Sequence, residues 1–258
     1  MKPLAELDAR GVRALLFDID DTFSTGGKIT AQAFAALERL HAAGTRTIAV
    51  TGRPAGWCDH IARMWPLDAV VGENGAFYFR YAGGRLRRHY QEPPELRLRH
   101  RERLAQIARD ILAAVPGCAL AADQPYRETD LAIDYCEDVP PLPLAEAERI
   151  AALMRAAGLH AKVSSIHVNG WFGDYDKLAM SRRLLRDEFA IELELERESV
   201  VYIGDSPNDA PMFAFFPRSV GVANVQRFAS VLSSPPKYVT SASAGAGFAE
   251  VVARLLAP

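Results

Sequence analysis

Three aspartates follow an apolar run near the start of the chain. The stretch FDIDDT places Asp18, Asp20 and Asp21 directly after ALLF at 14–17. In extended backbone, residues two apart point to the same side, so the Asp18 and Asp20 carboxylates would lie roughly 6–7 Å from each other. At an effective dielectric constant of about 20, two anions at that distance repel each other by roughly 2–3 kcal/mol. Such a pair stays ionised next to a cation, and otherwise one member takes up a proton.

A second acidic stretch, GDSPND, ends another apolar run and contributes Asp205, Asn208 and Asp209. If both stretches meet, their carboxylates form a cluster that suits a hard divalent cation with oxygen ligands, most simply Mg²⁺. The histidine and cysteine spacings that hold zinc are absent from the sequence. One Asp-x-Asp alone is more often a solvated strand end, whereas two such stretches indicate a metal site.

Lys177 supplies a charge of the opposite sign. It opens the helical pattern KLAMSRRLLRDEFA, where a positive charge opposes the helix macrodipole. Either the charge is simply tolerated there, or Lys177 faces the acidic residues and holds an anionic group. A cation, a lysine, the Thr51 hydroxyl and carboxylates together suit a phosphoryl group. One carboxylate can attack phosphorus, and a second carboxylic acid can protonate the leaving alkoxide and then deprotonate water.

The elements that must position these residues are short apolar strands alternating with helical patterns. Most of the strands are apolar on both faces, which is typical of a covered parallel sheet, and the alternation predicts a doubly wound α/β fold. Ligands of such sheets bind outside the carboxyl ends of the strands, where the polar residues gather here. The predicted strands are 14–19, 47–52, 69–74, 199–205 and 219–224, with 238–242 as a sixth candidate, and one predicted helix is 31–44.

The middle of the chain has a different order of elements. It is richer in arginine and proline, and it predicts a small α+β module inserted into the larger domain. We therefore expect a core of residues 1–80 and 173–258 and an inserted domain of residues 81–172. The elements predicted in the insert are a helix at 94–115, strands at 118–123 and 131–135, a helix at 143–158 and a strand at 162–168.

The motifs occur in an order that resembles a known family. FDIDDT is followed by AVTGR, by NGA, by the insert, by Lys177 and by GDSPNDAPMF. This order resembles the haloacid dehalogenase (HAD) superfamily of phosphohydrolases, in the branch with Cof-type, sucrose-phosphate and mannosyl-3-phosphoglycerate phosphatases. The resemblance covers nearly the whole chain. It implies a Rossmann-like core and an α+β cap that closes over the site and recognises the leaving group.

The resemblance also implies a role for each core motif. Asp18 would be the nucleophile and a metal ligand, and Asp20 would be the general acid and base, with its backbone carbonyl also at the metal. Asp205 would bind Mg²⁺, and Asp209 would bind it directly or through water and fix Lys177. The residues expected to bind the transferring phosphoryl group are Thr51, Gly52, Lys177 and Asn208. A second acid such as Asp20 argues against dehalogenation, because halide leaves without a proton.

The chain departs from the family at one motif position. The family often has Asp-x-Asp-Gly-Thr, whereas Asp21 stands here in place of the glycine. The change removes no catalytic side chain, but the extra charge affects the geometry of the turn or the affinity for the metal.

Residues that contact the rest of the substrate are harder to predict. The candidates are Arg53, Asn74, Arg127, His167 and Asn169, with Asp130 and Trp171 as further cap residues. Ordinary surface or packing roles are open for each cap residue. The predicted reaction is Mg²⁺-dependent hydrolysis of a small phosphorylated metabolite, a sugar or polyol phosphate, through an aspartyl-phosphate on Asp18.

Two other functions remain open from the sequence. A phosphomutase of the phosphomannomutase kind shares the motifs but needs a second phosphate site. The arginines available for that site are Arg85, Arg87, Arg88, Arg97, Arg99 and Arg127. A non-catalytic receiver-type domain also forms an aspartyl-phosphate, but such domains are about half this length and lack a cap.

Composition restricts the partners. The net charge is −2 and the pI is about 6.3, so no basic surface for nucleic acid is indicated. No apolar stretch approaches the ~20 residues that span a bilayer, and the N-terminus lacks the apolar core of a signal peptide. The three cysteines are far apart, as expected for free thiols in a reducing compartment. We therefore expect a cytoplasmic monomer or homodimer that binds a small molecule.

Overall fold

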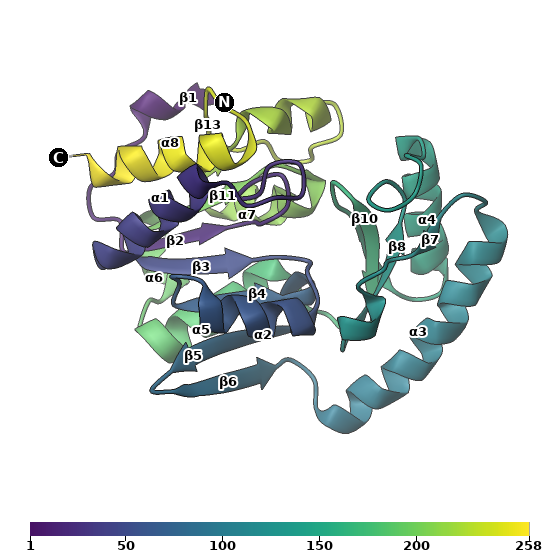
Figure 1. Ribbon diagram of the computed structural model, residues 1–258. Coiled ribbons are helices and arrows are strands. Elements are labelled where there is room, and N and C mark those ends of the chain that lie inside the picture. Colours follow the sequence, from purple (N-terminus) through teal and green to yellow (C-terminus); the bar gives the residue numbers. More distant parts are fainter. Residues whose placement is uncertain (258) are drawn as a thin grey trace.

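The computed structural model describes residues 1–257, which form two sheets with flanking helices (Figure 1). The larger sheet has nine strands in the order β1-β13-β12-β11-β2-β3-β4-β5-β6. Pairing is parallel from β1 to β4 and antiparallel for β4–β5 and β5–β6. Its strands are β1 Lys2–Pro3, β2 Ala14–Phe17, β3 Arg46–Val50, β4 Ala69–Gly72, β5 Phe77–Ala82, β6 Arg85–Tyr90, β11 Val200–Gly204, β12 Arg218–Gly221 and β13 Tyr238–Val239.

Helices cover both faces of this sheet, so the predicted doubly wound α/β fold is confirmed. Successive residues of a strand point to opposite faces. Leu15 and Phe17 of β2 accordingly pack with one group of helices, and Ala14 and Leu16 pack with the other. The first group is α1 Ala31–Ala42, α2 Ala55–Met64 and α8 Ala244–Leu256; the second is α5 Lys177–Phe189, α6 Leu193–Glu196 and α7 Ala210–Phe215.

The second sheet has four antiparallel strands in the order β7-β8-β10-β9. Two helices pack on it around a separate apolar core (Figure 1). Its strands are β7 Ala119–Leu120, β8 Asp130–Asp134, β9 His160–Val163 and β10 His167–Trp171, and its helices are α3 Pro94–Ala114 and α4 Leu144–Ala156. The short 3-10 helices of the chain are η1 Leu4–Glu6, η2 Glu73–Gly75, η3 Gln124–Tyr126, η4 Arg197–Ser199, η5 Pro207–Asp209 and η6 Ala223–Phe228.

The single strand predicted at 162–168 is wrong, because two strands replace it. β9 ends at Val163 and β10 begins at His167, and the two pair antiparallel. Ser164 closes the turn between them: its backbone N–H donates to the carbonyl of His167 over 2.8 Å, and its hydroxyl accepts from the His167 N–H over 3.0 Å. Serine side chains often stabilise turns in this way.

A hairpin that the sequence did not predict extends the larger sheet. β5 and β6 are joined by Gly83 and Gly84, whose φ angles are 59° and 73°. Two successive residues with positive φ form the tight turns that suit hairpins. The predicted start of the insert, residue 81, therefore lies within β5, and the second sheet is built from elements that follow this hairpin.

Within residues 1–257, no helix combines the length and apolar character needed to cross a membrane.

Candidate active site

The carboxyl ends of four neighbouring parallel strands carry polar residues, and three of these residues are predicted core residues. Asp18 follows β2, Thr51 follows β3, Glu73 follows β4 and Asp205 follows β11. The four strands are adjacent in the sheet in the order β11-β2-β3-β4, and each neighbouring pair is parallel. All four ends therefore lie at one edge of the sheet, which faces the second sheet (Figure 1).

A buried lysine joins two of the carboxylates. The Lys177 ammonium donates to Asp18 Oδ1 over 2.7 Å and to Asp209 Oδ1 over 2.8 Å. Burial lowers the lysine pKa, but the two carboxylates outweigh it, so the Lys177 pKa is raised. Lys177 is the first residue of α5, whose N-cap is Asp176: that side chain accepts from the Ala179 N–H over 2.7 Å. The two residues that begin the helix thus place the ammonium over the strand ends.

Three carboxylates form a compact buried cluster beside this lysine. Asp18, Asp205 and Asp209 each have an oxygen within 4.8 Å of the others. Burial raises the pKa of Asp18 and of Asp205, and neighbouring carboxylates raise both further, while Lys177 opposes the rise. The lysine carries one positive charge against three acidic groups. An all-oxygen donor set with excess negative charge fits a divalent cation such as Mg²⁺.

Asp209 and Asp205 are held in place by backbone and side-chain donors. Asp209 Oδ1 accepts from the Tyr202 hydroxyl over 2.5 Å, and its Oδ2 accepts from the Asp205 N–H over 3.0 Å. Asp205 accepts from the Thr22 hydroxyl over 3.2 Å and from Asn224 Nδ2 over 3.1 Å. Gly204 leaves room for this arrangement, since a Cβ there would lie 2.4 Å from Asp209 Oδ2.

Asp20 faces a different partner from Asp18. Arg53 Nη2 donates to Asp20 Oδ1 over 2.8 Å, and its Nε donates to both carboxylate oxygens over 3.0 Å. The same guanidinium donates to Glu137 Oε1 over 2.7 Å and to Asp123 Oδ2 over 3.4 Å. Glu137 and Asp123 belong to the segment of the second sheet. Arg53, predicted as a substrate contact, therefore joins Asp20 to that segment.

Asp21 has a backbone conformation that explains the usual glycine at its position. Its φ is 53°, in the left-handed region that glycine adopts readily and that aspartate tolerates better than most residues. Its N–H donates to Ser24 Oγ over 3.2 Å, and its carbonyl accepts from Asn224 Nδ2 over 2.9 Å. Its carboxylate lies 3.9 Å from the exposed Arg227. Asp21 thus keeps the turn of the glycine motif, and its partly exposed carboxylate adds to the negative charge that raises the pKa of Asp205.

Glu73, which the sequence analysis did not select, connects the two parts of the site. Its buried carboxylate accepts from the backbone N–H of Ala55 over 2.8 Å, of Glu128 over 2.9 Å and of Thr129 over 2.6 Å. It also accepts from the Thr129 hydroxyl. Burial raises the pKa of Glu73 to about 7, and the nearby Asp130 adds to the rise. A charged residue directly after an apolar strand was the available signal.

The predicted substrate residues of the second sheet surround the same edge, each with protein partners. Arg127 is buried, donates to Asp123 and Asp130, and reaches the Gly52 carbonyl over 2.8 Å. Asn169 Nδ2 donates to Asp130 Oδ2 over 3.0 Å. His167 Nε2 lies 2.8 Å from Glu137 Oε2. Trp171 is buried and stacks on Tyr175, which is a packing role.

A narrow cavity lies between the two sheets over Asp18. Its walls include Asp20, Gly52, Arg53, Arg127, His167, Asn169 and Asn208, together with the turn 164–166. Thr51 is buried below it, with its hydroxyl accepting from the Arg53 N–H over 3.0 Å. Asn74 lies next to Gly52, and its Nδ2 has no hydrogen-bond partner. The structure therefore brings every predicted core residue and three cap residues to one edge.

Comparison with known proteins agrees with this arrangement. Residues 15–97 match the family described as haloacid dehalogenase-like hydrolase. No curated protein sequence matches the chain. The structure is similar to that of a Thermoplasma acidophilum protein, with a TM-score of 0.71 and 16% identity over 95% of this chain and 98% of that one.

Two further similar structures are those of phosphatases. One is the sucrose-phosphatase of Synechocystis sp. PCC6803 in complex with sucrose and phosphate, with a TM-score of 0.65 and 16% identity over 95% of this chain and 98% of that one. The other is a subclass IIB sugar phosphatase, with a TM-score of 0.63 and 16% identity over 94% and 98%. The family match includes the motifs FDIDDT, AVTGR and NGA. The predicted resemblance to haloacid dehalogenase-like hydrolases is therefore confirmed for residues 15–97, and the similar structures share the fold of nearly the whole chain.

Proposed function

We propose that the protein is a Mg²⁺-dependent phosphatase that hydrolyses a small phosphorylated metabolite through an aspartyl-phosphate on Asp18. The observation that carries the proposal is the contact of the buried Lys177 ammonium with Asp18 and Asp209, inside a cluster of three carboxylates. A lysine and a cation on one side of Asp18 neutralise a phosphoryl group on approach, and Asp20 on the other side can transfer protons.

In the first step, a carboxylate oxygen of Asp18 attacks phosphorus and the bond from phosphorus to the ester oxygen breaks. Asp20 gives its proton to the departing oxygen, so that an alcohol is released. Lys177 stabilises the charge on the phosphoryl oxygens, with Thr51 and Asn208 as further contacts. Asp18, Asp205 and Asp209 would hold a Mg²⁺ ion, which would supply further positive charge to stabilise the phosphoryl group.

In the second step, Asp20 takes a proton from water as the water oxygen attacks phosphorus of the aspartyl-phosphate. Phosphate leaves and the Asp18 carboxylate is restored. Arg53 acts on both steps as a positioning residue, because its guanidinium fixes both oxygens of Asp20. The similar structures of a sucrose-phosphatase and of a sugar phosphatase support a sugar phosphate as substrate.

The arginines do not favour the phosphomutase alternative. Arg127 pairs with Asp123 and Asp130, Arg97 pairs with Glu128 and Arg88 pairs with Asp59. The remaining candidates, Arg85, Arg87 and Arg99, are exposed, and Arg85 and Arg87 lie on β6 of the larger sheet. A second phosphate site opposite Asp18 would need at least one of these guanidinium groups unpaired and facing the cavity.

The test measures phosphate release from p-nitrophenyl phosphate and from a panel of sugar and polyol phosphates, with Mg²⁺ and with a chelator. We expect Mg²⁺-dependent release of inorganic phosphate, and loss of turnover in Asp18→Asn with the fold intact by circular dichroism. Asp174→Asn is the matched control, because Asp174 is an exposed carboxylate near the start of α5. Normal turnover by Asp18→Asn would refute the assignment, and isomerised product that retains phosphate would favour a mutase.

A further inference from the structure

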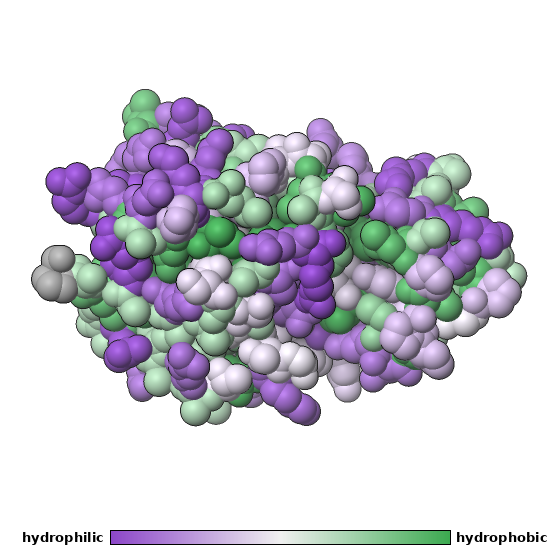
Figure 2. Space-filling model, turned by 90° about the horizontal axis from the view of Figure 1, so that it is seen from above, coloured by the Kyte–Doolittle hydropathy of each residue, from purple (hydrophilic) through white to green (hydrophobic). Residues whose placement is uncertain are grey.

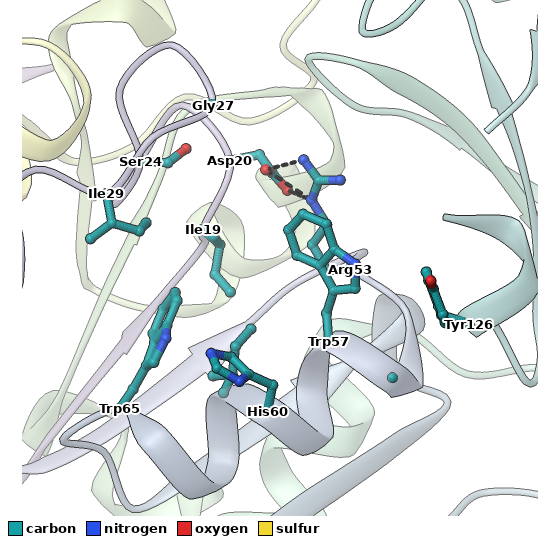
Figure 3. Close-up of a pocket in the computed structure, with 12 residues that line it drawn as sticks. Ile19, Asp20, Ser24, Gly27, Ile29, Arg53, Trp57, His60, Trp65 and Tyr126 are labelled. Atoms are coloured by element: carbon teal, nitrogen blue, oxygen red, sulfur yellow. Dashed lines mark hydrogen bonds and ion pairs between the residues drawn. The ribbon is translucent and has the colours of Figure 1, made fainter. Parts of the chain in front are cut away.

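A second and larger cavity lies directly beside Asp20 (Figure 3). Its volume is about 580 Å³, within the range of about 300–1,000 Å³ that small-molecule sites occupy. Helix α2 forms one wall and the segment that follows Asp20 forms another, as the close-up shows. The proposed phosphatase mechanism assigns no role to this cavity.

We call this cavity the aromatic pocket. Its walls are mainly aromatic and branched aliphatic side chains. Aliphatic side chains come from Ile19, Ile29 and Ile61, and aromatic ones come from Trp57, Trp65 and Tyr126; Ser24 and His60 are the polar lining residues apart from Asp20 and Arg53. Trp57 is 43% exposed and Tyr126 is 58% exposed. Aromatic side chains that stay partly exposed beside an ionic pair can also contact a ligand.

The aromatic pocket and the narrow cavity over Asp18 share two residues. Asp20 and Arg53 line both. Arg53 is also stacked on Trp57, with its guanidinium carbon 4.4 Å from the ring centroid, as Figure 3 shows. A leaving group that receives a proton from Asp20 therefore departs next to the mouth of the aromatic pocket, which is much roomier than the cavity over Asp18.

The second sheet completes the pocket from the opposite side. Tyr126 comes from η3, and this short helix packs on the first turn of α2. Gly56 makes that contact possible, because a Cβ at Gly56 would lie 2.9 Å from the Cβ of Tyr126. Both parts of the chain thus contribute an aromatic side chain to one cavity beside the proposed acid.

We propose that the aromatic pocket binds the leaving group of the substrate and selects a ring with a largely apolar face. The inference rests on the proposed phosphatase function. Stacking on Trp57 and contact with Tyr126 stabilise such a ring. An open-chain polyol would instead place several hydroxyls against isoleucine and tryptophan, where few partners are available and unpaired hydroxyls are costly. The ring is either an aromatic group or the apolar face of a pyranose.

The first test compares kcat/KM for 1-naphthyl phosphate, glucose 6-phosphate and glycerol 1-phosphate. We expect the better of the two ring substrates to have a higher kcat/KM than glycerol 1-phosphate. The ratio of these two kcat/KM values should fall about tenfold in Trp57→Ala. Trp57→Phe keeps a flat ring and should restore most of the ratio. Tyr81→Ala removes an exposed aromatic side chain of β5 that does not line the pocket, and it should leave the ratio unchanged.

The arms of this test separate the two kinds of ring. A loss in Trp57→Ala that is confined to 1-naphthyl phosphate identifies an aromatic group, and a loss confined to glucose 6-phosphate identifies a pyranose face. A ratio that is the same in the unmodified protein and in Trp57→Ala overturns the proposal. Because Trp57 also contacts Arg53, a loss shared equally by all three substrates counts as damage to the chemistry and likewise contradicts a role in ring selection.

A second measurement separates failure of the pocket from failure of the proposed function. Titration calorimetry of 2-naphthol and of methyl glucoside, which carry the two kinds of ring without phosphate, measures the pocket alone. We expect one of them to bind the unmodified protein and to lose about tenfold affinity in Trp57→Ala. If neither compound binds, the proposal that the aromatic pocket binds a ring is refuted, whether or not the protein releases phosphate. Trp57-dependent binding without phosphate release from any substrate would overturn the phosphatase and leave the ring site standing.

Discussion

Gly75 lets its backbone approach the backbone of Asp176 closely, directly before Lys177. Its φ is 108°, and a Cβ at this position would lie 2.0 Å from the carbonyl oxygen and 2.3 Å from the carbonyl carbon of Asp176. Asp176 is the N-cap of α5 and Lys177 is the first residue of that helix. The NGA motif therefore works through close approach of two backbones, which only glycine allows.

The cost of Gly75→Ala follows from these distances. To reach an ordinary contact of 3.4 Å, the two backbones must separate by about 1.4 Å. If the Lys177 ammonium moves with them, its distance of 2.7 Å to Asp18 Oδ1 rises to about 4 Å, beyond a hydrogen bond. A displacement of about 1 Å can lower the rate about 10²-fold. The positive φ and the overpacking together destabilise the fold by roughly 2–5 kcal/mol.

The assay combines phosphate release with urea unfolding. Gly44→Ala is the matched control, because Gly44 has a φ of 89° and no atom within 4 Å of a built Cβ. The free energy of unfolding of the control should fall by about 1–2 kcal/mol from backbone strain alone, and its activity should be unchanged. If Gly75→Ala loses no more stability than Gly44→Ala and hydrolyses substrate at the normal rate, then close approach at Gly75 does not position Lys177.

Three further predictions follow from the contacts of the site. Arg53→Ala removes all three hydrogen bonds that Arg53 donates to Asp20, and we expect kcat to fall about 10–10²-fold with a changed pH profile; an unchanged profile would exclude a positioning role. Burial raises the pKa of Glu73 to about 7, so the folded state binds the proton more tightly and the free energy of unfolding falls as pH rises from about 4.5 to 7. In urea unfolding, Glu73→Gln should lack the part of this fall that Glu73 causes. If the free energy of unfolding of both proteins depends on pH in the same way, the assignment to Glu73 is contradicted. Mg²⁺ should raise the melting temperature of the unmodified protein but not of Asp205→Asn, and an equal rise in both would place the ion elsewhere.

The sequence predicted the buried strands of the larger sheet and the meeting of the core residues at one edge, because local patterns determine both. ALLF at 14–17 is apolar on both faces, so a buried strand of a covered sheet was the natural interpretation. In a parallel sheet the residues after such strands must meet at one edge. Asp18 and Asp205 accordingly lie in one cluster although they are far apart in the chain.

The residues that the sequence did not predict depend on contacts between distant segments. Arg53 was predicted as a substrate contact, but its ion pairs with Asp20 and with the two acids Asp123 and Glu137 of the distant segment were not predicted. Glu73 was overlooked because its partners, the N–H groups near Thr129, are unrelated to it in sequence. The turn at Ser164 divides a run that reads as one strand. Local periodicity carries no information on such contacts.

The central claim is that phosphate passes through Asp18. The most direct measurement is mass spectrometry of protein quenched in acid during turnover, with Asp20→Asn used to slow release of phosphate from the intermediate. The account predicts one phosphoryl group on the peptide that contains Asp18, lost on standing with substrate exhausted and absent from Asp18→Asn. Turnover without phosphorylation of that peptide, or a phosphoryl group on another residue, would contradict it.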